Sequence, residues 1–396
     1  MRTTRLLKAA AASAALVLLA TGCSSSDSDT EDTEAAAATG YAGPVGEGEG
    51  QVNVLAWPGY VVQDPDNGTD WVTEFETNTG CKVNLKEFGT SDEAVKLMQG
   101  GGYDVVSASG DATLRLVASD SVQPVNTALV PNYADIFPGL KDKPWNTVDG
   151  VNYGVPHGRG ANLLMYNTEV VTPAPTSWKD TFDPASPYAG KVTAYDSPIF
   201  IADAAVYLMA TQPELGIKDP YALDQKQFDA AIAVLEAQKP LVSEYWSDYL
   251  KEMAAFKSGT SVLGTTWQVI VNAAQGEGTP VDAVKPSEGA TGWSDTWMVA
   301  KDTENINCSY EWLNWIVSPK TNAQVAEYFG EAPANAKSCA ETADPDHCTT
   351  FHAEDEAYWT DVYYWNTPST ECLDGRTDVE CVPYAKWSEA WSALRS

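Results

Sequence analysis

One carboxylate stands between two tryptophans in the segment GATGWSDTWMVA, which runs from residue 289 to residue 300. Alternation along a strand would place Trp293, Asp295 and Trp297 on the same face. A charged group beside large aromatic side chains is costly to bury unless it has a partner. Aromatic faces and a carboxylate together form a site for an ammonium group, through cation–π attraction and a charge-assisted hydrogen bond. The segment therefore predicts that Asp295 binds a cationic ligand beside Trp293, whereas Trp297 lies further along the strand and is expected to pack in the interior.

Tryptophans stand at the ends of other predicted strands as well. The chain has fourteen of them; Trp57 closes the first apolar run, and Trp267 ends the run SVLGTTW. Most tryptophans in a protein of this size pack in the interior, but a position at the end of a strand favours a cleft. Asp196 follows the run KVTAY in the same way. It serves there either as a second ligand for a cation or as a helix cap.

Motifs of other functional classes find little support in the sequence. His157 is the only histidine of the region where strands and helices alternate, and no serine lies in a G-x-S-x-G motif. The glycine run at 100–102 precedes a predicted strand, whereas a dinucleotide fingerprint follows one. The lack of a C-x-x-C pair and a total of three histidines argue against a metal site. A carboxylate pair for hydrolysis stays open, but we expect neither a cofactor nor a metal, and no enzyme.

Apolar runs and helical patterns alternate along the chain after residue 50. Strands are predicted at 52–57, 82–88, 103–109, 190–197, 261–267 and 281–286. Helices are predicted at 69–80, 91–102, 201–215, 224–240, 249–259, 268–276, 308–318 and 321–330. This alternation predicts parallel sheets covered by helices, with ligands at the carboxyl ends of the strands. The roughly 345 residues that follow position 50 exceed one ordinary core and favour two lobes.

The first fifty residues predict export. A basic start precedes an apolar run from 9 to 20, which is too short to span a bilayer as a helix. The run ends in LATGC, so residues 1–22 are predicted to be a lipoprotein signal peptide, and Cys23 a lipidated N-terminus like that of the bacterial lipobox. Residues 23–50 carry seven acids and no Lys or Arg, which predicts a disordered tether. The protein is therefore expected to be extracytoplasmic and anchored to the outer face of the cell membrane.

The net charge is strongly negative. The whole chain has 24 basic and 55 acidic residues, a formal charge of −31. Removal of residues 1–23 takes away three basic residues and no acid, which leaves 21 basic against 55 acidic residues and a charge of −34. Such a surface repels nucleic acid, because phosphate contacts require clustered Lys and Arg. It attracts cationic ligands instead.

Six cysteines beyond Cys23 predict disulfides, as is usual in exported proteins. They are Cys81, Cys308, Cys339, Cys348, Cys372 and Cys381. Short spacing favours two local bridges, Cys339–Cys348 and Cys372–Cys381. By elimination, Cys81 is left to pair with Cys308.

Several short motifs follow one another in a characteristic order. They are W-x-x-Y at 57–60, YDVV at 103–106, TSW at 176–178, YAGKV at 188–192 and GWSDTWMV at 292–299. In this order they resemble bacterial spermidine/putrescine-binding receptors of ABC importers, which have the type II periplasmic-binding-protein fold. The resemblance implies a two-lobed α/β protein, each lobe a mostly parallel sheet flanked by helices, with the ligand in the interlobe cleft. It also implies lobe boundaries, with lobe 1 at 51–158 and 294–334, and lobe 2 at 159–293 and 335–396.

The resemblance assigns ligand contacts by position. Trp57 and Tyr60 would line the lobe 1 side of the cleft. Asp196 and Asp295 match acids that bind amino groups. Trp267 and Trp293 match aromatics that pack along the methylenes of the ligand. Asn366 matches an amide near the far end of the ligand.

Some positions depart from the pattern of this family. Ala108 and Gly110 stand where a serine and an aromatic are usual, Ile199 replaces a second carboxylate, and Glu331 replaces a tyrosine. Asp111 and Glu331 are candidates to compensate for these losses. The predicted hinge segment GVPHGRG also carries His157 and Arg159. An arginine in the cleft would argue for an anionic group on the ligand, unless Arg159 pairs with a surface acid.

The sequence therefore predicts a monomeric, lipid-anchored receptor that closes over a small cationic solute. The ligand would be a polyamine such as putrescine or spermidine, and an ABC permease in the membrane would receive it. Two alternatives stay open. The ligand is a sugar or a carboxylated amine, since tryptophans and an aspartate also suit sugars, or the protein is an exported hydrolase that uses two of its acids.

Overall fold

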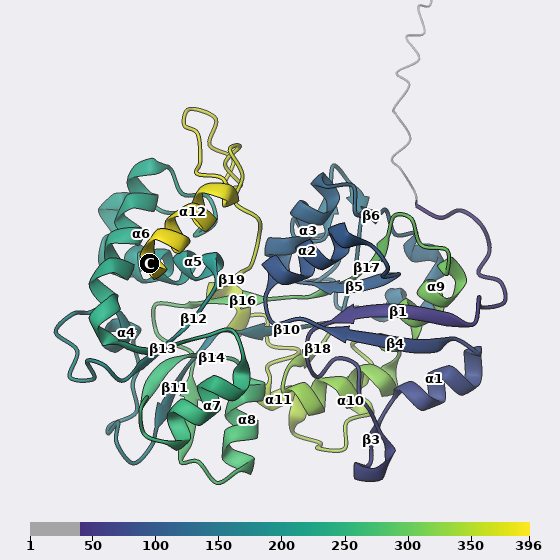
Figure 1. Ribbon diagram of the computed structural model, residues 1–396, viewed down its shortest axis with the longest axis horizontal. Helices are drawn as coiled ribbons and strands as arrows, with labels where there is room; N and C mark the ends of the chain where they lie inside the picture. The colour runs from purple at the N-terminus through teal and green to yellow at the C-terminus, as the bar shows by residue number, and fades with distance from the viewer. Residues whose placement is uncertain (1–39) are drawn as a thin grey trace, which may run out of the picture. The chain divides into compact units, whose positions relative to one another are not determined.

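The computed structural model describes residues 40–396 (Figure 1). The predicted signal peptide at 1–22, lipidation at Cys23 and most of the predicted tether lie outside the described residues. Within residues 40–396, no helix is long and apolar enough to cross a membrane.

One large sheet contains the first strands of the chain. Its order is β4 (Lys82–Glu87), β1 (Gln51–Ala56), β5 (Val105–Ala108), β17 (Thr296–Ala300) and β6 (Val122–Gln123), with β9 (Val155–Pro156) also paired to β17. β1 runs parallel to β4 and β5, whereas β17 is antiparallel to its three neighbours. The surrounding helices are α1 (Val72–Thr79), α2 (Ser91–Gly100), α3 (Gly110–Ala118), α9 (Ile306–Ile316) and α10 (Pro319–Phe329). We call this half lobe 1.

A second sheet forms the other half, lobe 2. Its order is β13 (Val242–Trp246), β12 (Val192–Tyr195), β14 (Leu263–Thr266), β11 (Leu163–Asn167) and β15 (Val281–Val284). β12 runs parallel to β13 and β14, and β11 is antiparallel to β14 and β15. Its helices are α4 (Lys179–Phe182), α5 (Ile201–Thr211), α6 (Gln225–Gln238), α7 (Tyr249–Lys257), α8 (Gln268–Gly276) and α12 (Tyr384–Arg395). The two-lobed α/β fold is confirmed, but in each sheet the parallel arrangement is limited to three strands.

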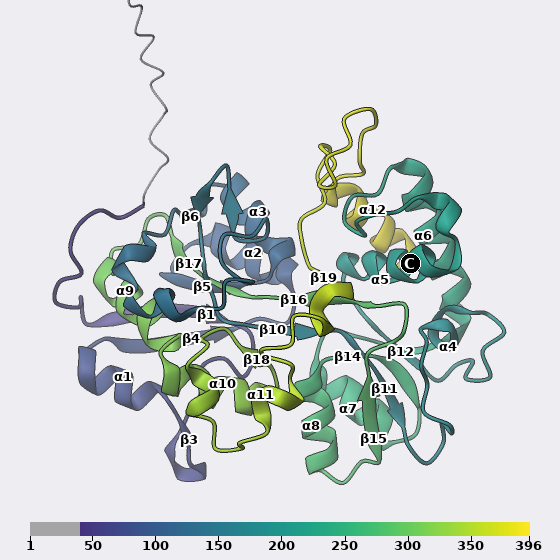
Figure 2. The ribbon, with the colours of Figure 1, turned by 180° about the vertical axis from the view of Figure 1, so that it is seen from behind.

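A smaller sheet lies between the two large ones (Figures 1 and 2). Its order is β18 (Ala332–Pro333), β10 (Gly158–Ala161), β16 (Ala290–Trp293) and β19 (Val362–Tyr364). β10 follows β9 of lobe 1 and leads into β11 of lobe 2, whereas β16 follows β15 of lobe 2 and leads into β17 of lobe 1. The chain therefore crosses between the lobes on paired antiparallel strands. Short elements complete the chain, namely β2 (Gln63–Asp64), β3 (Thr69–Asp70), β7 (Thr147–Val148), β8 (Val151–Asn152) and α11 (His347–Thr350).

Local sequence signals explain where several helices begin and end. The side chain of Asp70 accepts hydrogen bonds from the backbone N–H groups of Val72 and Thr73 at the start of α1. Gly80 ends α1 with a φ of 72°, a conformation that favours glycine. Asp224 and Gln227 form a reciprocal capping box at the start of α6. Strand β13, whose sequence is VSEYW, was not predicted, because its polar and apolar residues are mixed.

The end of the predicted tether differs from expectation. Residues 40–50 lie against lobe 1 rather than extending away from it. The carboxylate of Glu49 accepts hydrogen bonds from the backbone N–H groups of Asn307 and Cys308 at the first turn of α9. Tyr41 packs against Tyr310, with ring centroids 5.8 Å apart. A carboxylate satisfies the free N–H groups of a helix N-terminus, which the acidic composition alone does not reveal.

The three disulfides connect the cysteines as the spacing predicted. Cys339–Cys348 and Cys372–Cys381 each close a loop with a sequence separation of 9. Cys81–Cys308 has a separation of 227 and joins the start of β4 to α9. It therefore ties the two chain segments of lobe 1 that lie on either side of lobe 2 in the sequence.

We expect loss of Cys81–Cys308 to destabilise the protein most. Replacement of both cysteines with serine should lower the free energy of unfolding by about 5 kcal/mol, because a long loop regains its entropy in the unfolded chain. The matched control replaces Cys339 and Cys348, whose short loop predicts a loss of about 2.5 kcal/mol. Urea unfolding followed by circular dichroism measures both, and a larger loss in the control would contradict this ranking.

Candidate functional site

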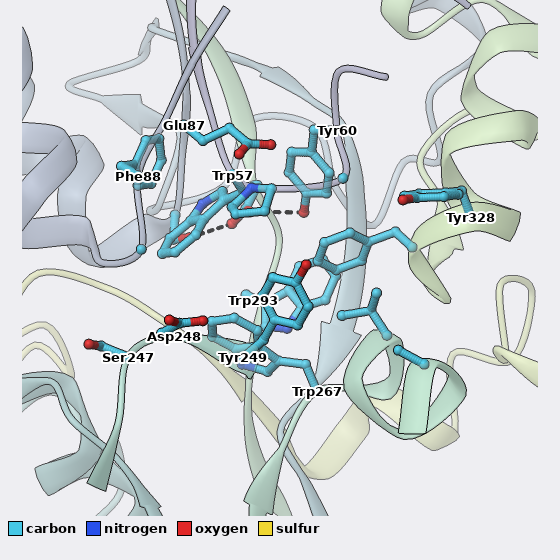
Figure 3. A pocket seen from close by; sticks show the side chains of 18 of the residues that line it. Trp57, Tyr60, Glu87, Phe88, Ser247, Asp248, Tyr249, Trp267, Trp293 and Tyr328 are labelled. Atoms are coloured by element: carbon cyan, nitrogen blue, oxygen red, sulfur yellow. Dashed lines mark hydrogen bonds between the residues drawn. The ribbon is translucent and has the colours of Figure 1, made fainter. Parts of the chain in front are cut away.

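A cavity of about 630 Å³ opens between the lobes (Figure 3). Its walls come from the segments that follow β1, β4, β13 and β14, from the junction of β16 and β17, and from helix α10. The segments after β1, β4, β13 and β14 lie at the carboxyl ends of parallel strands, where open α/β sheets bind ligands.

The lining of this cavity is aromatic and acidic. Nine of its side chains are aromatic, namely Trp57, Tyr60, Phe88, Tyr249, Trp267, Trp293, Tyr328, Phe329 and Trp365. Four carry carboxylates, namely Glu87, Glu93, Asp248 and Asp295. Among the described residues that line the cavity, none is Lys, Arg or His. The site therefore favours a cation with apolar segments.

Asp295 lies in a break of the crossing segment. The sequence predicted one continuous strand, but β16 ends at Trp293 and β17 begins at Thr296, which leaves Ser294 and Asp295 between them. The side chain of Asp295 is 3% exposed. Its Oδ1 accepts a hydrogen bond of 2.6 Å from Ser109 Oγ, and its Oδ2 one of 2.9 Å from Tyr60 Oη. Burial raises the pKa of Asp295 to about 6, although both hydroxyl groups act to lower it.

A tight turn after β1 positions two of the lining residues. The N–H of Tyr60 donates to the carbonyl of Trp57 at 3.3 Å, across Pro58 and Gly59. Gly59 has a φ of 93°, and proline before such a glycine is the pattern of a type II turn. The turn directs Trp57 against Phe88, with centroids 4.5 Å apart, and the phenol of Tyr60 toward Asp295.

Aromatic contacts and one hydrogen bond fix the lobe 2 wall. Trp267 Nε1 donates to Asn162 Oδ1 at 3.0 Å, and its ring meets Trp57 edge to face at 5.8 Å. Trp365 stacks on Tyr195 with centroids 5.8 Å apart and planes within 9°. Such pairs hold flat surfaces in place for an apolar ligand segment.

Trp293 packs directly over the backbone of the crossing strands. It is paired with Gly160 across β16 and β10. A Cβ at Gly160 would lie 2.2 Å from the indole, so this position requires glycine. Trp297 is fully buried in lobe 1, and its Nε1 donates to His157 Nδ1 at 2.9 Å, as expected for an interior residue.

Five of the predicted contact residues come together at the cavity. They are Trp57, Tyr60, Trp267, Trp293 and Asp295. Their contact with a ligand stays a prediction. Glu331 does not line this cavity, but its Oε2 lies 3.4 Å from Tyr60 Oη.

Three other predicted residues lie away from the cavity. Asp196 accepts hydrogen bonds from Trp391 Nε1 and Arg395 Nε, both at 3.0 Å, so helix α12 engages its carboxylate. Asp111 is buried, and its Oδ1 accepts a 2.7 Å hydrogen bond from Ser91 Oγ.

The third is Asn366, which is buried next to the lining residue Trp365. Its Oδ1 accepts a hydrogen bond from the backbone N–H of Thr367. The structure thus gives each of these polar groups an internal partner.

The two basic residues of the hinge segment also point away from this cavity. Arg159 is 2% exposed, and its Nη2 donates at 2.9 Å to both Glu356 Oε1 and the carbonyl of Ala353. Its guanidinium also lies 4.4 Å from the ring centroid of Trp359. The pairing with an acid removes the argument for an anionic group on the ligand. His157 is fully buried beside Trp297.

Sequence reasoning missed several lining residues. Glu87 and Phe88 end the correctly predicted strand 82–88, so their position at a carboxyl end was an available signal. Ser109 follows β5 in the same way. The signal for Asp248 and Tyr249 depended on β13, which was not predicted. The other acidic and aromatic lining residues are Glu93, Tyr328, Phe329 and Trp365. They lie on helices or after β19, and we identified no signal for them in the sequence.

Two α/β lobes, crossing strands and an interlobe cavity are the features of a receptor of the solute-binding class. The comparison with protein families agrees, because the model for the bacterial extracellular solute-binding protein family matches residues 70–350. The chain belongs to this family.

Relatives of this chain belong to the same class. The spermidine/putrescine-binding periplasmic protein of Escherichia coli K12 is 26% identical over 268 residues, which cover 66% of this chain and 73% of that protein. The putrescine/cadaverine-binding protein of Pseudomonas aeruginosa is 24% identical over 304 residues, which cover 71% and 78%.

Among solved structures, the spermidine/putrescine ABC transporter substrate-binding protein PotD of Streptococcus pneumoniae has a TM-score of 0.66 and 17% identity. The match covers 87% of this chain and 99% of that one. At this identity, the likeness shows the shared fold.

The raised pKa of Asp295 predicts that this side chain destabilises the empty protein at neutral pH. The unfolded carboxyl titrates near 3.8 and the folded one near 6, so the charge is disfavoured only in the folded state. The resulting instability is fully present above about pH 6 and is lost as the pH falls toward 3.8. We expect Asp295→Asn to raise the free energy of unfolding at pH 7.5 by about 1–3 kcal/mol, and to give no gain at pH 4.

Thermal unfolding of the ligand-free protein at both pH values measures this difference. Asp196→Asn serves as the matched control, because its carboxylate is paired with Arg395 and its replacement should bring no gain. A lower unfolding temperature for Asp295→Asn at pH 7.5 would show that the hydroxyl groups fully compensate the buried charge.

Proposed function

We propose that this protein is the receptor of an ABC importer and that it captures a small cationic amine of the polyamine class, such as putrescine or spermidine. One observation carries the proposal. The interlobe cavity combines nine aromatic and four carboxylate side chains with no basic one among its described lining residues. The names of the relatives from E. coli and P. aeruginosa, which bind spermidine, putrescine or cadaverine, support the same ligand class.

Asp295 is the proposed contact for the first ammonium group. It lies at the junction of the lobes, and its two oxygens are oriented by Ser109 and Tyr60. Trp293 and Trp267 then cover the adjacent methylene groups. Exclusion of water by the aromatic walls strengthens the charge-assisted hydrogen bond, because the local dielectric constant falls.

The second ammonium group requires another acid, and Asp196 is engaged by helix α12. Three other carboxylates line the cavity, namely Glu87, Glu93 and Asp248. Glu93 Oε2 accepts a hydrogen bond from Gly89 N, and Asp248 Oδ1 one from Leu250 N, which leaves each a second oxygen. We propose that these residues, from both lobes, replace Asp196 as the partner of the far amine.

The alternative ligands fit this cavity less well. A carboxylated amine would bring an anionic group into a lining without a basic side chain. A sugar would stack on the tryptophans but would leave the charge of Asp295 without a cationic partner. We therefore propose binding and release without catalysis, and an exported hydrolase is the less favoured reading.

Delivery requires a place at the membrane. We propose that residues 1–22 are removed, that lipidated Cys23 anchors the protein to the outer face of the cell membrane, and that the closed monomer presents its ligand to the permease. The sequence LATGC followed by serines supports the anchor, and the family's extracellular character supports the location.

The central experiment is calorimetry of residues 40–396 with putrescine and spermidine. Asp295→Asn is expected to weaken binding at least tenfold, about 1.4 kcal/mol, because the ammonium group loses its charged partner. Asp196→Asn is the matched control and should change affinity less than threefold, since its carboxylate pairs with Arg395.

Three further solutes test the ligand class. Butylamine lacks the second ammonium group and should bind more weakly than putrescine. Tighter binding of 4-aminobutyrate or of glucose than of putrescine would replace the polyamine proposal with one of the alternatives. Equal affinity of the wild type and Asp295→Asn for putrescine would remove Asp295 from the site.

The affinity should also depend on pH. A pKa of about 6 for Asp295 means that it carries its full charge at pH 7.5 and is mostly protonated at pH 5. Putrescine affinity is therefore expected to fall about tenfold between pH 7.5 and pH 5, since both amines stay charged throughout. Titrations at the two pH values measure the change, and in Asp295→Asn most of it should disappear.

A further inference from the structure

A second acid lies directly behind the cavity. Glu331 precedes β18 and is 1% exposed. Its carboxyl group packs over Gly158, where a Cβ would lie 2.5 Å from the carboxyl carbon. The two oxygens face different partners. Oε2 lies 3.4 Å from Tyr60 Oη, and Oε1 lies 3.4 Å from His157 Nε2.

Tyr60 has one hydroxyl hydrogen for two carboxyl groups. The hydroxyl is 2.9 Å from Asp295 Oδ2 and 3.4 Å from Glu331 Oε2. The shorter contact takes the hydrogen, because Asp295 is the better placed acceptor. An ionised Glu331 would then face the lone pairs of the phenol oxygen. A protonated Glu331 would instead donate its own hydrogen to that oxygen.

His157 does not supply the missing positive charge. Its Nδ1 accepts the hydrogen bond from Trp297 Nε1, so this nitrogen carries no hydrogen. A neutral ring then carries its hydrogen on Nε2, which lies 3.4 Å from Glu331 Oε1 without forming a hydrogen bond. Complete burial lowers the pKa of His157 to about 3, which keeps the ring neutral near pH 7.

The other basic groups near Glu331 do not pair with its carboxyl group. His347 Nε2 contacts the backbone carbonyl of Glu331 rather than its carboxyl group. A smaller cavity of about 390 Å³ on this side is lined by Glu331 together with three basic residues, Arg159, Lys285 and His352. These three pair with Glu356, Asp361 and Asp355, respectively. In the described part of the chain, every neighbouring cation is therefore already paired.

We propose that Glu331 is a protonated, neutral acid whose hydroxyl donates to Tyr60 and thereby directs the hydrogen of Tyr60 to Asp295. Hydrogen bonds then run from Glu331 to Tyr60 and from Tyr60 to Asp295. His157, which accepts from Trp297, lies behind them with its Nε2 3.4 Å from Glu331 Oε1. The pair of acids holds one negative charge, on Asp295, and Glu331 is a positioning residue rather than a second ligand.

Burial and charge both favour this state. Burial raises the pKa of Glu331 well above its ordinary value, and the nearby charge of Asp295 raises it further. A single buried charge at the junction of the lobes also matches one ammonium group of a ligand. The protonation of Glu331 stands apart from the proposed function, whereas its effect on affinity rests on that function.

Infrared spectroscopy tests the protonation without any ligand. We expect the ligand-free wild type at pH 7 to show the carbonyl stretching band of a protonated carboxylic acid, and Glu331→Gln to lose part of it. Glutamine keeps the shape of the protonated acid and can still donate to Tyr60. Other buried acids, such as Asp203 and Glu252, contribute equally to both proteins and cancel in the difference spectrum. An unchanged band would overturn the proposal.

Calorimetry with putrescine tests the positioning role. Glu331→Gln should keep the affinity of the wild type within threefold, whereas Glu331→Leu, which has no donor, should weaken binding about fivefold or more. A tenfold loss in Glu331→Gln, as large as that in Asp295→Asn, would overturn the proposal by showing a charged contact. If putrescine binds none of the proteins, the proposed ligand class fails, and the infrared difference still decides the state of Glu331.

Discussion

The site depends on one buried carboxylate at the point where the chain returns from lobe 2 to lobe 1. Asp295 occupies a break between β16 and β17, and two hydroxyl groups of lobe 1, from Ser109 and Tyr60, hold its oxygens. Hydroxyl donors compensate only part of the free energy that burial of a charge costs. The charge of Asp295 is therefore only partly compensated within the protein, and the proposed cationic ligand would neutralise it. The same residue belongs to the crossing segment. Under the proposed function, the ligand would therefore contact the chain where it passes from lobe 2 to lobe 1.

The lobes contribute different kinds of groups to this site. Lobe 1 supplies two of the four lining acids, Glu87 and Glu93, and the hydroxyl groups that orient Asp295. Lobe 2 presents mainly flat apolar surfaces, such as Trp267. Under the proposed mechanism, an amine would first meet the acids of lobe 1. Closure of lobe 2 would then remove water, which adds apolar burial and strengthens the ion pair.

Local patterns made much of the fold predictable, whereas contacts between distant residues were not. The helix predicted at 268–276 coincides with α8, and the spacing of the cysteines gave all three disulfides. The break at Asp295 escaped prediction, because alternation alone does not show where a crossing strand changes sheet. Asp196 pairs with Arg395, which is 199 residues away in the sequence. No local pattern indicates a contact over such a separation. The sequence therefore suggested a ligand contact at Asp196, which follows a predicted strand, as well as at Asp295, which lies between two tryptophans.

The departures from the family pattern change where negative charge lies around the cavity. Ile199 and the pairing of Asp196 with Arg395 remove negative charge from one side of the cavity. Glu331 introduces an acid where a tyrosine is usual, yet a neutral Glu331 offers a hydroxyl donor, as tyrosine does, and adds no charge. Lining acids at Glu87, Glu93 and Asp248 then restore negative charge elsewhere. The proposed ligand class can thus be kept although individual contacts differ, because a polyamine requires separated charges and apolar walls rather than particular residues at particular positions.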